Sequence, residues 1–266
     1  MMRLIDTHCH LFMADYASDI DAVIERAKGY HVHQMIVAGI DARTSQQAVQ
    51  LADSHKEVYA AVGLHPNSSV NNIEEELKAI HQMLSHPKVV AVGEIGLDYY
   101  RDFVPISEQK DRLRRQLEMA EESGLPLILH NRNAIVDLFP IVSEWVQHQR
   151  SNNHPTDFRY GVFHSFSETA EIAQQIVALG FLIGISGVIT YPNAPKITDV
   201  VRAVSLEHLL IETDAPYLCP QPCRGKRNEP ANLIYTLQKL SYVLEIAPEA
   251  VADATTQNAQ LLFGIG

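Results

Sequence analysis

Eight short runs of apolar or β-branched residues recur along this 266-residue chain, and a stretch with helical spacing follows each of them. The runs cover residues 3–7, 34–38, 59–64, 89–93, 126–129, 160–163, 181–185 and 209–212. Between them, apolar residues stand three or four positions apart, as at Ile73, Leu77, Ile80 and Leu84, which indicates amphipathic helices. Eight strand–helix units without a long linker fit an α/β chain of about 250 residues that closes into a (β/α)8 barrel. We therefore predict a single TIM-barrel domain over residues 1–266, with an extra C-terminal helix.

The main alternative is an open, doubly wound sheet of parallel strands. Sheets of that kind that bind nucleotides carry a glycine-rich phosphate loop after an early strand. The chain has no G-x-G-x-x-G or Walker-type loop, and residues 184–187 lack the final glycine of a nucleophile elbow. The barrel is therefore the favoured fold.

Two segments of the expected barrel stand out by composition. Residues 148–157 are polar and are expected to form a loop before the sixth strand, not a domain boundary. After the last strand, residues 216–228 make a proline-rich, partly basic loop, and two helices are expected near 230–245 and 247–263.

The charge of the chain limits the partners it can bind. Its net charge is −11 at pH 7 and its pI is about 5.6. Proteins that coat duplex nucleic acid usually present a basic face. If this acidic protein binds a nucleic acid, it must do so at one local site and not over its whole surface. No apolar run approaches the ~20 residues of a membrane helix, and acidic residues follow the first methionines too soon for a signal peptide. We expect a cytoplasmic protein without a membrane partner.

The cysteines do not form a structural pattern. Cys9, Cys219 and Cys223 are odd in number and widely spread, so they do not predict a disulfide framework. A zinc knuckle at Cys219 and Cys223 is not favoured, because the chain offers no second pair.

The first strand carries a possible metal half-site. On an extended strand, residues two apart share a face, so His8 and His10 lie together and Cys9 points away. Two neutral imidazoles side by side can bind a divalent ion. The motif His-x-His is short, however, and two surface histidines without a role are an equally good interpretation of it alone.

Further imidazoles and carboxylates follow other expected strands: His65, Glu94, His130, His164 and Asp214. Because a barrel gathers the carboxyl ends of its strands at one face, these side chains are expected to converge. The alternatives are core packing for His130 and His164, a turn cap for the aspartate and no role for His65.

Four of the histidines and both carboxylates form the metal set that we predict, namely His8, His10, Glu94, His130, His164 and Asp214. One catalytic zinc needs three protein ligands and a water, so six ligands are too many for a single ion. They suit two ions, Mg²⁺, Mn²⁺ or Zn²⁺, roughly 3.5–4 Å apart and sharing a carboxylate. Such a pair clamps the attacking and leaving oxygens of a displacement at phosphorus, with Asp214 as the group that orients or deprotonates the water.

Two neighbours of these residues are candidates for supporting roles. Glu212 lies two positions before Asp214 on the same strand face, where it could orient a ligand histidine or simply be a buried, paired acid. Arg132 shares a face with His130, so its planar guanidinium could form two hydrogen bonds to a phosphate or a salt bridge to a neighbouring loop.

The loops contribute candidates for substrate binding. Arg224, Lys226 and Arg227 form a basic cluster that could hold a nucleic-acid backbone or be a solvated loop. Aromatic residues after the fourth strand, Tyr99, Tyr100 and Phe103, could stack single-stranded bases or pack on the barrel rim.

Taken together, the motifs strongly resemble the TatD family of metal-dependent deoxyribonucleases, within the amidohydrolase-like barrels. The matching segments are IDTHCH at 5–10, GLHP at 63–66, VGEIGLD at 92–98, ILHNRNA at 128–134, GVFHSFS at 161–167, ETDAPY at 212–217, RGKRNEP at 224–230 and the late Asn258. The resemblance covers nearly the whole chain in the right order. Two departures, Asn133 and the stretch 165–168, touch no expected ligand but bear on how substrate is held.

The resemblance implies a TIM-barrel hydrolase with two divalent ions. It assigns His8, His10 and Asp214 to one ion, His130 and His164 to the other, and Glu94 to both. Glu94 and Asp214 would be the catalytic carboxylates. The substrate would bind to His65, Arg132, Arg224 and Arg227, and Glu212 would contact the metal ligands without binding an ion itself. The implied substrate is DNA, as single strands or ends, with no obligate protein partner.

Two other classes of function remain open at the level of sequence. A binuclear hydrolase of a small ester, amide or phosphoester would use the same ligands. Related binuclear enzymes often place a carboxylated lysine at strand four, where this chain has Glu94, which favours the nuclease branch. A non-enzymatic metal-binding protein is the third class, and metal-dependent turnover would eliminate it.

Overall fold

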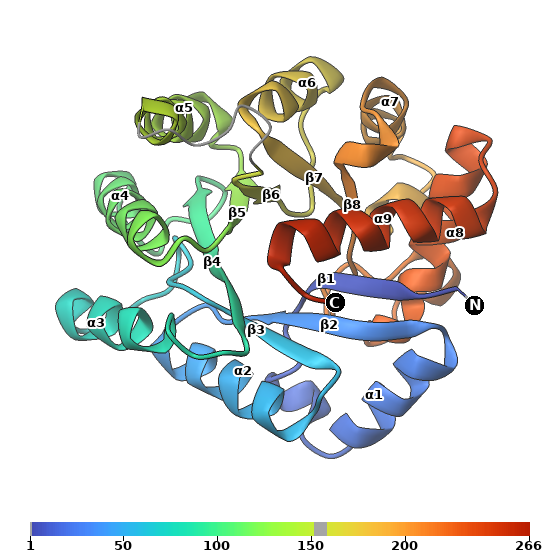
Figure 1. The fold of residues 1–266 in the computed structure, drawn as a ribbon, viewed down its shortest axis with the longest axis horizontal. Helices are drawn as coiled ribbons and strands as arrows, with labels where there is room; N and C mark the ends of the chain where they lie inside the picture. Colours follow the sequence, from blue (N-terminus) through green and yellow to red (C-terminus); the bar gives the residue numbers. More distant parts are fainter. Residues whose placement is uncertain (1, 152–158) are drawn as a thin grey trace.

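The computed structural model describes residues 2–151 and 159–266, and its centre is a barrel of parallel strands (Figure 1). Each strand pairs with its neighbour in the chain, in the order β1 to β8. The strands are β1 (Leu4–Cys9), β2 (Val32–Ala38), β3 (Val58–Val62), β4 (Val89–Asp98), β5 (Leu127–Arg132), β6 (Gly161–Phe163), β7 (Phe181–Ile185) and β8 (Leu209–Ile211). The predicted (β/α)8 fold is confirmed.

The first and last strands meet just beyond their ends and nearly close the barrel. Cys9 and Ala215 form a parallel bridge, and the amide of His10 donates to the carbonyl of Ala215 at 2.7 Å. The amide of Asp214 donates to the carbonyl of His8 at 2.9 Å. The closure therefore brings two predicted metal ligands from opposite ends of the chain into contact.

The helices surround the strands (Figure 1): α1 (Ile20–Gly29), α2 (Ala42–Ser54), α3 (Ile73–Met83), α4 (Ile106–Ser123), α5 (Ile135–Ser151), α6 (Ala170–Leu179), α7 (Pro195–Ala203), α8 (Leu233–Leu244) and α9 (Pro248–Phe263). Local chemistry sets their ends. Asp41 and Thr44 form a reciprocal capping box at the start of α2, and Gly124 ends α4 at φ 69°, a conformation that glycine adopts without strain. In the ranges that the structure describes, no helix combines the length and the apolar character needed to cross a bilayer.

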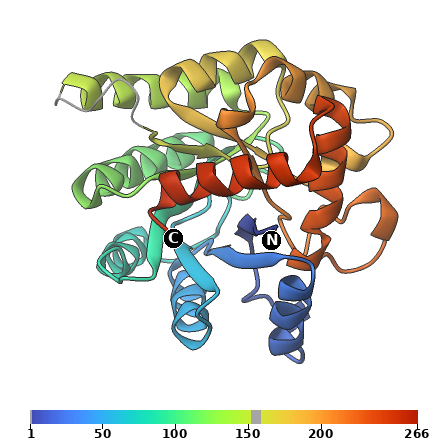
Figure 2. The ribbon, with the colours of Figure 1, turned by 45° about the vertical axis from the view of Figure 1, so that its right-hand side comes forward.

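The hydrophobic core has two parts, one between the barrel and the helices and one inside the barrel. The inner part packs strand residues such as Ile5, Ile36 and Ile128 against Leu262 and Phe263 of α9. Figures 1 and 2 show α9 lying across one mouth of the barrel. The side chain of Asn258 fixes it there by donating to the carbonyls of Leu206 and Leu209, both at 2.9 Å, just before and at the start of β8. The extra C-terminal helix thus closes the end of the barrel opposite the loops that follow the strands.

Several expected boundaries differ from the structure, most clearly those of the fourth and fifth strands and of the loop before the sixth. The fourth and fifth strands run past their predicted ends, to Asp98 and Arg132, because they continue to pair with each other from Gly96↔His130 to Asp98↔Arg132. The expected loop at 148–157 begins later than predicted, since α5 continues to Ser151. Residues 152–157 of that loop lie outside the described residues.

Candidate metal centre

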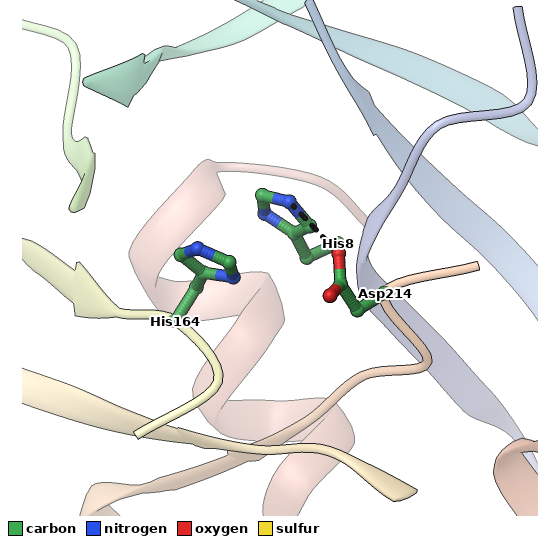
Figure 3. A group of neighbouring side chains, drawn as sticks. All are labelled: His8, His164 and Asp214. Atoms are coloured by element: carbon green, nitrogen blue, oxygen red, sulfur yellow. Dashed lines mark ion pairs between the residues drawn. The ribbon is translucent and has the colours of Figure 1, made fainter. Parts of the chain in front are cut away.

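Six side chains from five different strands or strand ends converge where the loops leave the barrel. His8 lies in β1, Glu94 in β4 and His130 in β5, whereas His10, His164 and Asp214 directly or closely follow β1, β6 and β8. Figure 3 shows three of them, with the rings of His8 and His164 stacked at 4.0 Å and the Asp214 carboxylate beside His8. In each of several triads, including His8–His164–Asp214, the donor atoms lie within 4.8 Å of one another.

The first half of the centre is built by β1 and the turn after β8. The Nε2 atom of His8 lies 3.5 Å from Oε2 of Glu94 and 3.8 Å from Oδ1 of Asp214. For Nε2 of His10 the same two distances are 3.7 and 3.4 Å. Tetrahedral ligands at about 2.1 Å from an ion lie roughly 3.4 Å from each other, so these four donors fit a divalent ion.

The second half faces the other oxygen of the same carboxylate. Oε1 of Glu94 lies 2.7 Å from Nδ1 of His130 and 2.8 Å from Nε2 of His164, and the two nitrogens are 3.1 Å apart. Each oxygen of Glu94 therefore lies close to a different pair of histidines. A carboxylate in that position is suited to bridge two ions.

The backbone and a buried acid orient two of the imidazoles. Nδ1 of His10 is 2.8 Å from the carbonyl of Ala38, which only accepts, so in a neutral ring the proton lies on Nδ1 and Nε2 keeps its lone pair. Nε2 of His130 is 3.3 Å from Oδ2 of Asp98, so a neutral His130 ring protonated on Nε2 would offer the lone pair of Nδ1 to an ion. When protonated, the same two nitrogens donate to the carboxylates of Asp214 and Glu94.

Asp98 is a site residue that the sequence analysis missed. It is buried, and its Oδ1 accepts from the backbone amides of Tyr100 at 2.9 Å and Arg101 at 3.2 Å, which aims Oδ2 at His130. The apolar run predicts a strand that ends at residue 93, whereas β4 continues to Asp98. Its spacing of four from Glu94 was the available signal, since such residues share a face of a strand.

Glu212 lies behind His164, fully buried. Its Oε1 accepts from the backbone amide of Ser165 and is 3.7 Å from Nδ1 of His164, while Oε2 accepts from the Thr7 hydroxyl at 3.4 Å. Gly184 leaves the space for this carboxylate, since a Cβ there would lie 2.6 Å from Oε2. Both alternatives considered for Glu212, a paired acid and a partner of a ligand histidine, are compatible with these contacts.

The two carboxylates that face the histidines are ionised. Burial disfavours the charge of Glu94, but the charge of His164 and hydrogen bonds from His130 and His164 outweigh burial and hold its pKa well below the usual value. Burial is likewise outweighed at Asp214, where the hydrogen bond and charge of His10 lower the pKa. Both groups can therefore act as anionic ligands, and Asp214 as a proton acceptor.

His65 borders the centre as a hydrogen-bond donor. Burial and the neighbouring His130 lower its pKa to about 3, so the ring is neutral. Its Nδ1 accepts from the amide of Asn67 at 3.1 Å, which puts the proton on Nε2, and Nε2 lies 3.8 Å from Oε1 of Glu94. In this tautomer the nitrogen that faces the centre carries a hydrogen and does not offer a lone pair to an ion.

The predicted phosphate-binding arginines have different environments. The guanidinium of Arg132 is exposed and stacks 3.9 Å above the ring of Tyr100, and that of Arg224 is exposed 4.9 Å above Tyr191. Arg227, in contrast, forms two 2.8 Å hydrogen bonds to the carboxylate of Asp19. The guanidinium of Arg227 is therefore already paired with a carboxylate of the same protein.

The aromatic residues after β4 also divide into two kinds. Tyr99 is partly buried and donates to Asp137 at 2.8 Å. Tyr100 and Phe103 are 62% and 60% exposed, and one face of the Tyr100 ring is covered by Arg132. The expectation of rim packing therefore describes Tyr99 and not the other two.

With this geometry, comparison with known proteins identifies the family. A family model described as TatD related DNase matches residues 5–264. The chain belongs to the TatD family. The relative from Bacillus subtilis (strain 168) named uncharacterized metal-dependent hydrolase YabD is 38% identical over 262 residues, which cover 98% of this chain and 99% of that protein.

A second TatD-family relative links sequence and structure. The protein YjjV of Escherichia coli (strain K12), also named an uncharacterized metal-dependent hydrolase, is 34% identical over 99% of this chain and 98% of its own. The crystal structure of YjjV superposes with a TM-score of 0.89, covering 100% and 99% of the two chains. The TatD-family hydrolase of Entamoeba histolytica shares the fold at 23% identity and a TM-score of 0.84 over 100% of this chain and 99% of its own. Family, fold and donor set together describe a metal-dependent hydrolase of the TatD family.

Proposed function

We propose that this TatD-family chain, as one domain, is a divalent-metal-dependent deoxyribonuclease that hydrolyses phosphodiester bonds in single strands or at the ends of DNA. The single observation that carries the proposal is the position of Glu94. Its two oxygens face His8 and His10 on one side and His130 and His164 on the other. A shared carboxylate is what a two-ion phosphodiesterase requires.

The roles of the protein groups follow from their contacts. Two divalent ions held here would lower the pKa of a water and stabilise charge on the oxygens of the phosphate. Asp214 is anionic, lies 14% exposed at the open side of the centre, and accepts the proton of the attacking water. Glu94 has a pKa well below its usual value and stays ionised throughout. Its two oxygens fix the position of the two ligand sets relative to each other.

We assign three side chains to the binding of the phosphate. Nε2–H of His65 is a neutral donor whose pKa of about 3 keeps it neutral at any working pH. Arg132 and Arg224 supply exposed guanidinium groups, each of which can donate two hydrogen bonds to a phosphate. Arg227 is already paired with Asp19, so we assign it to the structure of the loop and not to the substrate.

The preference for single strands rests on the aromatic rim. Tyr100, on the face that Arg132 does not cover, and Phe103 are exposed rings, and unpaired bases stack on such rings whatever their sequence. The net charge of −11 opposes binding of a long duplex across the surface, which favours local capture of a strand or an end. We propose a cytoplasmic enzyme that acts without an obligate protein partner, in keeping with its three free cysteines.

The test is hydrolysis of labelled single-stranded DNA by chelator-treated protein with and without added Mg²⁺, Mn²⁺ or Zn²⁺. Glu94→Ala is the test variant, and Asp199→Ala, on the outer helix α7, is the matched control for loss of a carboxylate. Cleavage that returns with metal, persists in the control and is absent from the test variant supports the proposal. Metal-dependent turnover of small esters, amides or phosphodiesters without DNA cleavage would favour a small-substrate hydrolase instead.

A further inference from the structure

The loop between β8 and α8 carries a pair of thiols that the proposed hydrolysis does not use. The Sγ atoms of Cys219 and Cys223 are 3.0 Å apart, and the Cys219 thiol also lies 3.0 Å from the carbonyl oxygen of Cys223. Both cysteines are free. Cys219 is buried and Cys223 is partly exposed, so one thiol of the pair is accessible from solvent.

The surrounding contacts hold the thiols facing each other. The Tyr191 hydroxyl donates to the carbonyl of Cys219 at 2.9 Å, and the amide of Gln221 donates to the Thr190 hydroxyl at 2.8 Å. The loop also lies against Gly187, where a Cβ would meet the carbonyl oxygen of Leu218 at 2.6 Å. Both sides of the pair are therefore held by residues 187–191, a short 3-10 helix and its C-cap after β7.

We propose that Cys219 and Cys223 are a redox-modifiable dithiol, which small-molecule disulfides of the glutathione type oxidise to an intrachain disulfide. A disulfide has an S–S bond of about 2.05 Å, so the sulfurs need to approach by only about 1 Å. The spacing of four residues and the proline-bounded loop keep this movement local.

The chemistry balances as two thiol–disulfide exchanges. The thiolate of Cys223 attacks one sulfur of the oxidant, which breaks the oxidant's S–S bond and releases one small thiol. The thiolate of Cys219 then attacks Sγ of Cys223, forms the intrachain bond and releases the second small thiol. Two protein thiols are oxidised, one small disulfide is reduced to two thiols, and the two protons pass to them.

The order of attack follows from the environment of each sulfur. Burial and the neighbouring Cys223 raise the pKa of Cys219 to about 12, whereas Cys223 is the more exposed sulfur. Cys223 is therefore the group that meets the oxidant first. Once it carries the small thiol, it no longer opposes ionisation of Cys219, which completes the bond.

Oxidation also bears on Arg224, which the proposed function assigns to the phosphate, so this part rests on the proposed function. Arg224 directly follows Cys223, and its guanidinium lies 4.9 Å above Tyr191, the residue that holds the carbonyl of Cys219. Drawing Cys223 toward Cys219 moves the backbone from which Arg224 extends. We expect KM for DNA to rise at least threefold in the oxidised protein, with little change in kcat.

The first experiment incubates the native full chain with graded ratios of oxidised to reduced glutathione, followed by acid quench, alkylation and trypsin digestion. Residues 203–224 form one tryptic peptide with both thiols, and Cys9 falls in a separate peptide, 4–26. The expected product is a 203–224 peptide lighter by two hydrogens that is alkylated only after reduction. Cys9, fully buried in the barrel, should stay reduced and reports that the fold is intact.

Two variants and one rate measurement complete the test. Cys223→Ser should give no intrachain bond, and Cys219→Ser should accumulate a mixed disulfide with glutathione at Cys223. Thiols that stay reduced, or two separate glutathione adducts in the unsubstituted chain, would overturn the dithiol. An unchanged KM in fully oxidised protein would overturn only the effect on substrate, while absence of any DNA cleavage would concern the proposed function and leave the thiol result standing.

Discussion

Oε1 of Glu212 lies 3.7 Å from Nδ1 of His164, while the other nitrogen of the same ring faces Glu94 at 2.8 Å. We expect this fully buried acid to favour a proton on Nδ1 of His164 and so to help orient the ring. Glu212→Gln should lower the affinity for the ion at His130 and His164 by about 10–100-fold, as loss of a carboxylate behind a metal-bound histidine usually does. Calorimetric titration of chelator-treated protein with Mn²⁺ or Zn²⁺ measures the effect.

Gly184→Ala is a companion variant that touches no ligand. Its new Cβ would lie 2.6 Å from Oε2 of Glu212 and must displace that carboxylate. The same loss of affinity is expected. Full affinity in both variants would show that Glu212 serves only as a paired buried acid.

Asp98→Asn should affect one half of the centre. The amides of Tyr100 and Arg101 require an acceptor at Oδ1, so the new amide nitrogen would replace Oδ2 and donate to Nε2 of His130. The proton of His130 would then move to Nδ1 and block its lone pair. We expect a titration that retains one ion and weakens the second by about 10–100-fold; equal weakening of both ions would contradict this mechanism.

Arg132 should contribute to substrate binding and not to metal content. Lysine keeps the charge but lacks the planar fork and its stacking on Tyr100, so Arg132→Lys should raise KM for single-stranded DNA about tenfold, equivalent to about 1.4 kcal/mol. Steady-state kinetics, with the metal content measured in parallel, test this. Arg202→Lys, an exposed arginine on α7, is the control, and an equal rise in KM there would point to a general effect of charge.

Removal of metal should lower the thermal stability. An ion that binds only the folded state at 100 times its Kd stabilises the fold by about 2.7 kcal/mol. For a chain of this size that corresponds to a fall in Tm of roughly 5–10 °C on addition of a chelator. Thermal unfolding with and without chelator measures the fall. Glu94→Gln, which lacks an anionic bridge, should show little change, and a fall of full size in that variant would place the stabilising ion elsewhere.

Acid should weaken the contact between the first helix and the loop after β8. Hydrogen bonds from Arg227 and Arg26 lower the pKa of Asp19 to about 2. Because the folded pKa is lower than the unfolded value, the stabilisation is present above about pH 4 and is lost as the pH falls toward 2. Urea midpoints of the unsubstituted chain and Asp19→Asn should therefore differ at pH 6 and converge near pH 2, whereas a constant difference would contradict the role of ionisation.

Much of the fold could be predicted because its signals are local. Alternating apolar runs and helical spacing indicated the barrel, and the i, i+2 geometry of a strand placed His8 beside His10, with their Nε2 atoms 3.2 Å apart. The topology of a barrel then predicted that ligands far apart in sequence would converge.

The features that were missed depend on partners that no local pattern reveals. Asp98 lay beyond the predicted strand end because pairing with β5, and not the apolar run, extends β4. The pairing of Arg227, a predicted substrate residue, with a carboxylate 208 positions earlier in the chain was likewise not foreseen. The tautomer of His65 follows from a single backbone amide, that of Asn67, which becomes visible only in three dimensions.

The contact between His8 and Asp214 has a consequence for when the centre can form during synthesis of the protein. The two residues stand 206 positions apart, and the hydrogen bond between their backbones belongs to the seam that closes the barrel. A ribosome must release nearly the entire chain before that seam can form. An unfinished polypeptide therefore lacks one side of the centre, which would keep the nascent hydrolase inert until its synthesis is complete.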